Sequence, residues 1–451
     1  MPEFFGTTLP RSEAHCRSLA RLTVTKQHLI AMRILLTGAT GFIGRHLAVA
    51  LRAAGHEVIE ARRVVTDREG KVQADFARDL RPDDWLPKLA GIECVINAVG
   101  ILRQRGAQTF ERIHTTAPCA LFEACVRAGV ARVVQISALG AETGRSAYFS
   151  SKHAADEFLV QLPLDWTIVQ PSVVFGPGGS SARLFTMLAS LPLIPVPGQG
   201  RQPIQPVHID DLTACIVALL ADEHSMRKKI PIVGRQPLLL REFLSELRIS
   251  LGLRRTLIVP VPMWLMRIGA AVAQWLPRSL LDRDTLVMLE AGNTADPTMT
   301  SQLLGREPRH VGHFVAAPYR SAVRRDALLS WLLPLLRFSV AVVWIWTGLV
   351  SLGLYPVEQS YALLARVGAP ASWAPVLLIG AGLLDLALGL ATLVLRRRRP
   401  LWLMQMGLIA AYTVIISIKL PEFWLHPYGP ILKNLPLLVS IYALYLLESD
   451  R

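Results

Sequence analysis

Apolar and polar positions follow two different patterns along the chain, and the change falls near residue 328. Between 32 and about 230, short apolar runs typical of buried strands alternate with stretches of helical periodicity. The predicted strands are 33–36, 58–61, 72–75, 93–98, 132–137 and 166–170, and the predicted helices are 42–54, 110–128 and 149–161. Because strands alternating with helices form parallel sheets, the pattern predicts an α/β fold, a doubly wound parallel sheet of Rossmann type.

The flanks of this alternating region are less regular. Residues 231–327 contain helical stretches near 240–252, 262–276 and 284–292, which we assign to a smaller C-terminal lobe of a nucleotide-binding domain covering 32–327. Residues 1–31 are polar and contain no apolar run of signal-peptide length. They are expected to be a disordered or non-native extension, with Met32 as the natural start; a targeting presequence is the alternative.

Beyond 328 the apolar runs become much longer. They cover 338–355, 374–395, 401–418 and 431–447, each near the length that crosses the hydrocarbon core of a bilayer. Four buried helices of a soluble domain are the alternative, but such helices rarely stay apolar on all sides. We therefore predict a four-helix transmembrane domain over 328–451.

Composition narrows the class of protein. Hydrophobic residues make up 52% and charged residues 18%, with a mean hydropathy of +0.37, which excludes a disordered chain. The net charge of +14 is compatible with nucleic acid, an anionic cofactor or an anionic membrane, but no helix-turn-helix or clustered basic recognition helix favours nucleic acid. The five cysteines lack metal or disulfide spacing, so we expect no metal site and reduced thiols at Cys16, Cys94, Cys119, Cys125 and Cys215.

Arginines are distributed unevenly around the apolar runs. Arg320, Arg324 and Arg325 precede the first run, and the cluster 396–399 lies between the second and third. By the positive-inside rule, the nucleotide-binding domain and the C-terminus face the cytoplasm of a multi-pass inner-membrane protein.

A glycine-rich segment follows the first predicted strand directly and opens a helix. It reads G-x-x-G-x-x-G, and its candidate cofactor-binding residues are Thr37, Gly38, Thr40, Gly41, Phe42, Ile43 and Gly44. Glycines let the backbone turn tightly and approach a pyrophosphate, which lies at the positive end of the helix. The segment therefore predicts a dinucleotide site.

Residues at the ends of the next strands indicate which dinucleotide binds. Arg62 and Arg63 stand at the end of the second strand and suit a 2′-phosphate, whereas Glu60 lies inside it, so NADP is favoured over NAD. Asp75 and Phe76 end the third strand, where we expect them to border the adenine. Small residues end the fourth strand, where the nicotinamide half would pass, namely Ala98, Val99 and Gly100.

Tyr148 and Lys152 are spaced i, i+4 in a predicted helix, which places them on one face. A neighbouring ammonium would lower the pKa of the phenol, and Ser137 at the end of the fifth strand could hydrogen-bond a substrate carbonyl or hydroxyl. This trio suits proton transfer coupled to hydride transfer. A structural pair in a domain that only binds nucleotide is the alternative.

These motifs together resemble the extended or atypical short-chain dehydrogenase/reductases. The glycine-rich segment, Asp75, the Tyr148/Lys152 pair and the stretches 170–177 and 206–212 carry the resemblance. It implies that Pro171 borders the cofactor. The stretch 95–100 is most similar to the nucleotide-binding subunit of respiratory complex I and its bacterial relatives. Three features depart from the common pattern, namely His114 in place of Asn, Gln170 in place of Arg, and a short spacing from Ser137 to Tyr148.

Residues 328–451 resemble the DoxX-like membrane family, most distinctively in the stretch 424–430 with Lys433 and Asn434. Asp385 lies near the middle of the second apolar run, where an ionisable group is costly and marks a quinone-head site, a proton site or a packing contact.

The sequence leaves three functions open. The first is a membrane-anchored, NADP(H)-dependent oxidoreductase that transfers hydride to a hydrophobic carbonyl or a quinone-like or isoprenoid substrate. The second is a non-catalytic NADPH-binding subunit or assembly factor of a membrane redox complex. The third, weaker, is an epimerase or dehydratase of the extended class.

Overall fold

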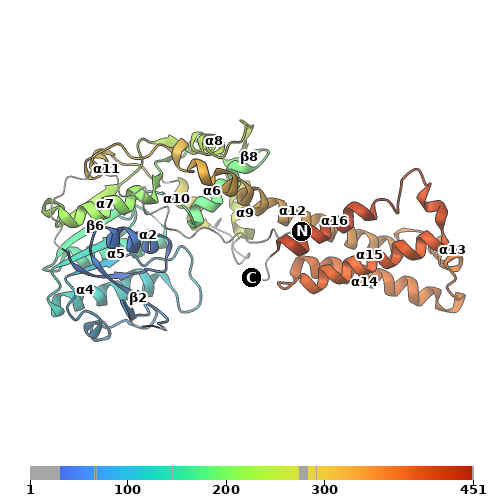
Figure 1. Ribbon diagram of the computed structural model, residues 1–451, viewed down its shortest axis with the longest axis horizontal. Helices are drawn as coiled ribbons and strands as arrows, with labels where there is room; N and C mark the ends of the chain where they lie inside the picture. Colours follow the sequence, from blue (N-terminus) through green and yellow to red (C-terminus); the bar gives the residue numbers. More distant parts are fainter. Residues whose placement is uncertain are drawn as a thin grey trace, which may run out of the picture. The chain divides into compact units, whose positions relative to one another are not determined.

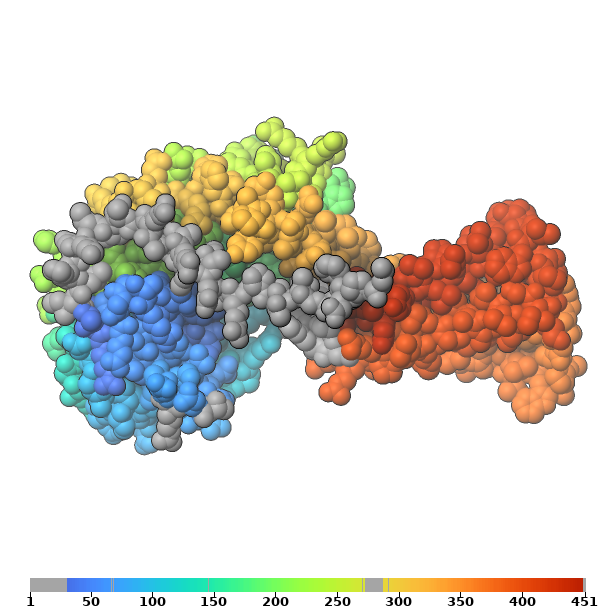
Figure 2. Space-filling view, viewed as in Figure 1, coloured from blue at the N-terminus to red at the C-terminus, as the bar shows by residue number. Residues whose placement is uncertain are grey.

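The computed structural model describes residues 31–65, 67, 69–144, 146–273, 283–290 and 292–448. The chain divides into two units, Met1–Arg324 (unit 1) and Arg325–Arg451 (unit 2). Figures 1 and 2 show the ribbon and one face of the surface. Apart from Ala31, the predicted N-terminal extension lies outside the described residues.

A parallel sheet forms the centre of unit 1. Within the described residues it has seven strands in the order β11-β6-β5-β4-β1-β2-β3. Their bounds are β1 Arg33–Thr37, β2 Glu57–Arg62, β3 Lys71–Gln73, β4 Cys94–Asn97, β5 Arg132–Ile136, β6 Asp165–Pro171 and β11 Lys228–Ile232. Because β1 pairs with both β2 and β4, the winding reverses at β1, and ligands of such sheets bind at the carboxyl ends beside this reversal. The six predicted strands and the doubly wound fold are confirmed; β11, which contains two lysines and a proline, was not predicted.

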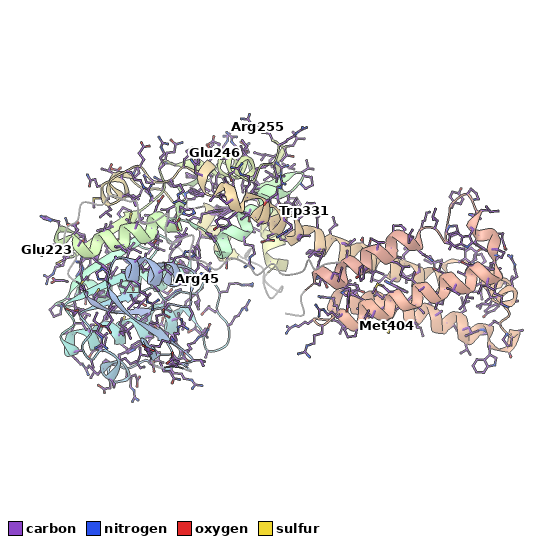
Figure 3. The ribbon with its side chains drawn as sticks, viewed as in Figure 1. Arg45, Glu223, Glu246, Arg255, Trp331 and Met404 are labelled. Carbon is purple, nitrogen blue, oxygen red and sulfur yellow. The ribbon has the colours of Figure 1, made fainter. Side chains whose placement is uncertain are left out.

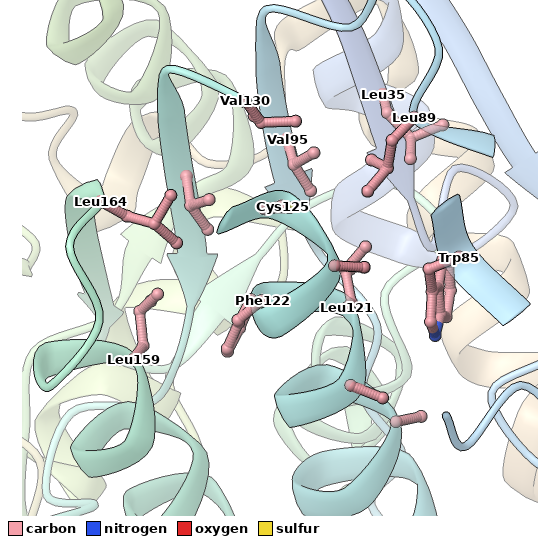
Figure 4. Close-up of a cluster of buried hydrophobic side chains, with 14 of the residues drawn as sticks. Leu35, Trp85, Leu89, Val95, Leu121, Phe122, Cys125, Val130, Leu159 and Leu164 are labelled. Carbon is pink, nitrogen blue, oxygen red and sulfur yellow. The ribbon is translucent and has the colours of Figure 1, made fainter. Parts of the chain in front are cut away.

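Helices cover both faces of this sheet. On one face α2 (Phe42–Ala53) and α7 (Ile209–Ala221) pack on the apolar side chains of β1 and β4. On the other face lie the π-helical turn η2 (Glu111–Thr116), α4 (Ala117–Ala128) and α5 (Ala147–Val160). Figure 4 shows Leu121 and Phe122 of α4 and Leu159 of α5 packed within this second core. Each such buried side chain contributes about 1.5–3 kcal/mol, so the two cores hold the sheet between its helical layers.

The C-terminal lobe of unit 1 has its own apolar core. The lobe contains α6 Ser180–Ser190, β8 Ile194–Pro197, α8 Leu240–Ser250, β13 Ile258–Val261, α9 Met263–Ala273, α10 Arg283–Glu290 and α11 Thr298–Leu304. Phe243 and Leu247 of α8 are fully buried there, and β13 pairs in parallel with β8. Two short pairs link the lobe to the sheet region, β7 Val174–Phe175 with β10 Val207–His208 and β9 Pro203–Ile204 with β12 Leu238–Leu239.

Unit 2 is helical. Within the described residues, three segments are long and apolar enough to cross a membrane by length and composition, Ala317–Leu354, Ala371–Val394 and Arg399–Lys419. They contain α12 Arg320–Leu349, α14 Ala374–Val394 and α15 Arg399–Lys419. The fourth predicted run forms α16 (Asn434–Leu447), which is shorter than about 20 residues, so a fourth span stays a prediction. An unpredicted helix, α13 (Val357–Val367), follows Pro356 and ends at Gly368.

Small residues bring α12 and α14 close together. A Cβ on Gly348 would lie 2.8 Å from the carbonyl oxygen of Gly382, and one on Gly389 would lie 2.5 Å from Cγ1 of Ile345. Asp385 of α14 is buried in this bundle. Its Oδ1 has no hydrogen-bond partner within the described residues, and the same is true of Trp344 Nε1 and Gln405 Oε1.

Candidate active site

The loop between β1 and α2 approaches the end of β4 so closely that only glycine fits. Gly38 has a φ of +69°, and a Cβ there would lie 2.6 Å from the carbonyl oxygen of Ala98. A Cβ on Gly44 would lie 2.1 Å from the carbonyl oxygen of Gly38, which itself accepts a 2.8 Å hydrogen bond from Gly41 N–H. Thr40 and Gly41 are exposed at the start of α2, whose first turn holds no acidic residue. This geometry leaves the positive helix end open to an anion.

The other predicted residues of this loop hold it in place. Thr37 is fully buried and donates a 2.6 Å hydrogen bond from its hydroxyl to Asn97 Oδ1. Ile43 packs on the core beneath the sheet, and the ring of Phe42 lies against Gly179, where an added Cβ would be 2.8 Å away. These three side chains therefore support the loop through contacts within the protein.

The end of β2 carries a buried acid between two arginines. Glu60 is 5% exposed, and its carboxylate is bound by Arg52 of α2 at 2.6 Å and by Arg62 at 2.5 Å. Burial alone would raise the pKa of Glu60, but the hydrogen bonds and charges of Arg52 and Arg62 outweigh it and lower that pKa. The acid is therefore ionised and neutralised by partners from its own fold. Sequence reasoning missed Arg52, which only the packing of α2 on β2 brings to this strand.

A surface pocket of about 570 Å³ opens beside the ends of β2 and β3. Its walls include Arg63, Gln73, Asp75, Arg78 and Lys88. Asp75 accepts a 3.0 Å hydrogen bond from Ala77 N–H and lies 3.8 Å from Arg78. Arg63 is exposed, so the pocket presents a cation that no acid of the strand neutralises in the way Glu60 neutralises Arg62.

Phe76 does not line this pocket. Its ring is buried in the core, with its centroid 5.0 Å from that of Trp85 in an edge-to-face contact. The predicted pair at the end of β3 is thus split by the structure. Asp75 faces the pocket, whereas any contact of Phe76 with a cofactor would be made by its main chain.

The ends of the central strands are joined by buried amides. Asn97 donates a 2.7 Å hydrogen bond from Nδ2 to Gln135 Oε1 on β5 and accepts the Thr37 hydroxyl on β1. Beyond Asn97 the chain becomes progressively accessible, with Ala98 and Val99 half-buried and Gly100 exposed. Pro171, at the end of β6, is buried, and its carbonyl accepts a 3.0 Å hydrogen bond from Leu139 N–H.

Lys152 is anchored by the carboxyl ends of β4 and β5. It lies on α5, is 3% exposed, and donates hydrogen bonds to the carbonyls of Val99 at 3.1 Å and Ile136 at 3.0 Å. Burial lowers the pKa of Lys152 to about 8, against the opposing effect of the Asp156 charge. Its ammonium therefore binds the two strand ends together directly behind Gly100, where a Cβ would lie 3.5 Å from Nζ.

Tyr148 lies in an aromatic environment. Its ring makes edge-to-face contacts with Phe110, His114 and Phe149, and Met288 of α10 packs on the same small cluster. Burial, followed by the charge of Asp156, raises the pKa of Tyr148 to about 12. The expectation that Lys152 lowers this pKa is not met, because the ammonium is held by main-chain carbonyls and the nearby charge that acts on the phenol is negative.

Ser137 is bound to an acid that the sequence analysis did not identify. Its hydroxyl donates to Oδ2 of Asp156, and both side chains are buried. Burial raises the pKa of Asp156 to about 6, although the Ser137 hydrogen bond and the Lys152 charge oppose this. Asp156 lies one helical turn beyond Lys152, so a spacing of i, i+4, i+8 from Tyr148 was the signal in the sequence.

His114 connects the loop after β4 to α5. Ile101 N–H donates to Nε2 at 2.9 Å, so Nδ1 carries the proton and faces the Ser151 hydroxyl, also at 2.9 Å. Burial, together with the charge of Lys152, lowers the pKa of His114 to about 2, so the ring is neutral. It lies in the π-helical turn η2, a local irregularity often found at functional sites. His114 therefore positions the Gly100 loop rather than supplying charge.

Two known families match separate parts of the chain. Residues 34–233 match the NAD dependent epimerase/dehydratase family, and residues 341–442 match the DoxX-like family. The chain is thus similar to the first family over 34–233 and to the second over 341–442.

Within the described residues, no group of three or more His, Cys, Asp or Glu side chains could hold a metal ion.

Curated relatives match the first of these domains. The chain is 32% identical over 191 residues to a protein named ceramide reductase from Caulobacter vibrioides, covering 41% of this chain and 60% of that protein. It is 30% identical over 225 residues to NADH dehydrogenase (ubiquinone) 1 alpha subcomplex subunit 9 of Arabidopsis thaliana mitochondria, covering 47% of this chain and 55% of that protein. The matches thus span 55% to 60% of the length of these relatives.

Solved structures with the same fold include an NADPH-dependent quinone oxidoreductase of Escherichia coli in complex with NADPH. It has a TM-score of 0.52 at 18% identity, over 63% of this chain and 99% of that chain. A second structure of an NADPH-dependent quinone oxidoreductase from Escherichia coli has a TM-score of 0.50 at 17% identity, with the same coverage. At this level of identity the likeness concerns the fold alone.

Proposed function

We propose that this chain, an epimerase/dehydratase-like domain joined to a DoxX-like membrane domain, is a membrane-bound NADP(H)-dependent oxidoreductase that acts on a hydrophobic carbonyl or quinone-like substrate. The observation that carries the proposal is the position of Tyr148, Lys152 and Ser137 around the carboxyl ends of β4 and β5. Lys152 binds the carbonyls of Val99 and Ile136, and Ser137 follows Ile136 directly. Tyr148 contacts the ring of His114, which binds the loop after Gly100 through Ile101 N–H. The curated relative named ceramide reductase and the solved structure named quinone oxidoreductase both carry names of oxidoreductases, the class proposed for this chain.

The nucleotide site fits a dinucleotide. Gly38 and Gly44 leave no room for a Cβ, so the loop packs tightly against the end of β4 and the first turn of α2, where it can border a bound dinucleotide. The open N-terminus of α2, which follows Gly41, would hold the pyrophosphate, and Arg63 with Asp75 would border the adenosine end. A bound NADPH would supply the hydride, and the residues of the chain would bind the substrate and move the proton.

Three side chains would transfer the proton, hold the strand ends in position and bind the substrate. Tyr148 would hold a proton at its phenolic oxygen and pass it to the substrate oxygen. Lys152 fixes the main chain at Val99 and Ile136, so it keeps the strand ends in position. The Ser137 oxygen keeps its acceptor capacity while its proton is donated to Asp156, so it suits a substrate hydroxyl better than a carbonyl when Asp156 is ionised.

The surroundings of Tyr148 favour an apolar substrate. Phe110, Phe149 and Met288 all lie against this residue or its cluster, and no acid lies in that aromatic contact set within the described residues. A charged substrate would lose hydration there without a partner, at a cost that apolar groups do not incur.

The proposal is tested with the full chain purified in detergent. NADPH deuterated on one face of C4 would be supplied with ubiquinone analogues, prenyl aldehydes and long-chain ketones. Stereospecific transfer of deuterium to one substrate class supports the function. Tight NADPH binding without transfer to any class contradicts it.

We expect cofactor preference to depend on Arg62 and Arg63 in different ways. Arg63→Ala should weaken NADPH by about 10- to 100-fold and NADH little, because one charge-assisted hydrogen bond is worth about 1.5–3 kcal/mol. Arg62→Ala should also free Glu60 for a ribose hydroxyl and so strengthen NADH. Isothermal titration with both cofactors checks this, with Arg81→Ala, another exposed arginine, as the control. Equal losses for both cofactors in Arg63→Ala would contradict NADP specificity.

We expect the rate of carbonyl reduction to rise as pH falls through about 6, the pKa of Asp156. Above that pH the ionised carboxylate of Asp156 accepts the hydrogen bond that the Ser137 hydroxyl donates. Below it, the protonated carboxyl can donate to Ser137, so the Ser137 hydroxyl is free to donate to a substrate carbonyl. One such hydrogen bond is worth about 2- to 10-fold in rate. The pH profile of kcat/KM checks this, and Asp156→Asn, which always carries a donor, should remove the inflection. An unchanged inflection in Asp156→Asn assigns it to another group.

A non-catalytic NADPH-binding subunit of a membrane redox complex is the second candidate. The raised pKa of Tyr148 and the Arabidopsis relative named as an NADH dehydrogenase subunit favour it. In that case a Tyr148→Phe variant would restore growth of a deletion strain as well as the unmodified chain.

We place the protein in the inner membrane, with unit 1 and the C-terminus in the cytoplasm. The support is the clustering of arginines at one end of two candidate spans: Arg320, Arg324 and Arg325 lie in the first turns of α12, and the arginines of 396–399 lie at the start of α15. A C-terminal reporter that is active only in the cytoplasm tests this orientation.

A further inference from the structure

The C-terminal lobe of unit 1 exposes large apolar side chains on consecutive elements. On α9, Trp264, Leu265 and Ile268 are 64%, 45% and 53% exposed. Leu257, just before β13, and Val259, within it, are exposed as well. Residues spaced one and four apart share one face of a helix, so α9 presents an apolar stripe outward. We call these five residues the β13–α9 surface. Soluble proteins rarely expose so many adjacent large apolar side chains without a partner.

The charged residues within the segment that carries this surface are all basic. The segment 252–273 contains Arg254, Arg255 and Arg267 and no Asp or Glu. Arg254 and Arg255 are exposed, and Figure 3 shows Arg255 extending outward from the lobe. Arg267 is paired with Glu290 of α10 at 3.3 Å. Apolar side chains with Trp on one side and arginines beside them are typical of segments that lie in the interface of an anionic bilayer.

The lobe that carries this surface is also the origin of the first membrane helix. Val323 of α12 packs on the same apolar core as Leu253 and Ile258. A Cβ on Gly252 would lie 3.4 Å from Cδ of Arg320, the first residue of α12. This helix continues into the first candidate span, so the lobe is joined covalently to a segment that can cross the membrane.

We propose that the β13–α9 surface inserts into the headgroup region of an anionic bilayer and forms a second membrane contact in addition to the spanning helices. A bilayer explains the pattern better than a protein partner, because α12, which packs on the core of this lobe, continues into a candidate membrane span. The exposed indole of Trp264 matches the preference of Trp for the headgroup level. The proposal rests on this geometry and does not depend on the reaction proposed above.

The test places a nitroxide on the full chain in vesicles of phosphatidylcholine and phosphatidylglycerol. Trp264→Cys and Ile268→Cys would be labelled in a background with Cys16→Ser and Cys119→Ser, and relaxation by oxygen compared with relaxation by a water-soluble nickel chelate. Val49→Cys is the matched control, because Val49 is an apolar residue on α2 with 55% exposure. We expect the ratio of oxygen to nickel relaxation to be several-fold higher at 264 and 268 than at 49.

Two results would overturn the proposal. One is equal access of nickel to all three sites, which means that the surface faces water. The other is protection of 264 and 268 from both reagents, which means that a protein or a second copy covers them. If the labelled variants fail to fold, Trp264→Phe tests the same membrane contact by fluorescence quenching. Quenching of intrinsic fluorescence by phosphatidylcholine brominated near the headgroup should fall relative to the unmodified chain, and unchanged quenching would contradict the proposal.

Discussion

Tyr148→Phe is expected to reduce kcat by about 100- to 10,000-fold, the usual contribution of a general acid or base. The ring would keep its edge-to-face contacts with Phe110, His114 and Phe149, so only the phenolic oxygen is lost. NADPH affinity and the midpoint of thermal unfolding should therefore stay close to those of the unmodified chain. Single-turnover oxidation of bound NADPH in detergent micelles is the measurement.

The matched control is Phe110→Leu, which disturbs the same aromatic cluster without removing a hydroxyl. We expect it to affect KM for the apolar substrate more than kcat. If Tyr148→Phe turns over NADPH as fast as the unmodified chain, Tyr148 is not the general acid. Burial, which raises the pKa of Tyr148 to about 12, would then explain why the phenol does not give up its proton. The non-catalytic function would then be the better conclusion.

Gly38→Ala is expected to weaken NADPH by at least about tenfold, since loss of about 1.4 kcal/mol of binding already gives that factor. The new Cβ would meet the Ala98 carbonyl oxygen at 2.6 Å, so the loop between β1 and α2 must move away from the end of β4. That movement misaligns the start of α2, whose first N–H groups would bind the pyrophosphate. Fluorescence titration of NADPH measures the effect.

Gly55→Ala is the control, because it introduces backbone strain like Gly38→Ala but no steric clash with a neighbouring strand. Gly55 lies just beyond the other end of α2, has a φ of +93°, and has no atom within 4 Å of an added Cβ. It should therefore lose about 1–2 kcal/mol of folding stability through left-handed strain alone and bind NADPH normally. If both variants bind NADPH equally well, the Gly38 loop does not form the cofactor site.

The β13–α9 surface and the chemistry of the candidate site are connected through unit 1. α9 packs against α10, and Met288 of α10 belongs to the cluster around Tyr148. If the surface lies in the headgroup region and the reaction is as proposed, a bilayer-dissolved substrate would reach Tyr148 with little exposure to water. The two ideas fail separately, because the nitroxide measurement requires no turnover and the deuterium measurement can be made in detergent.

Local patterns in the chain were sufficient for the scaffold. Alternating strand and helix periodicity predicted the sheet from β1 to β6, because burial on both faces leaves a continuous apolar signal in central strands such as β1 and β4. The glycines of the first loop and the i, i+4 pair Tyr148/Lys152 could be identified for the same reason, since each depends on residues close together in the chain. Elements with mixed composition, such as β11 and α13, were missed because their stability comes from packing rather than from their own pattern.

The partners of the chemical groups depended on contacts between distant segments. Ser137 is joined to Asp156, Glu60 to Arg52, and Lys152 to the carbonyl of Val99, and each pair connects different elements. Burial then changed the charges, since the pKa of Asp156 rises and the phenol of Tyr148 holds its proton more tightly than a nearby lysine alone would suggest. Residue types and their spacing specified where the site lies, whereas desolvation and hydrogen bonding in the folded chain set its protonation states.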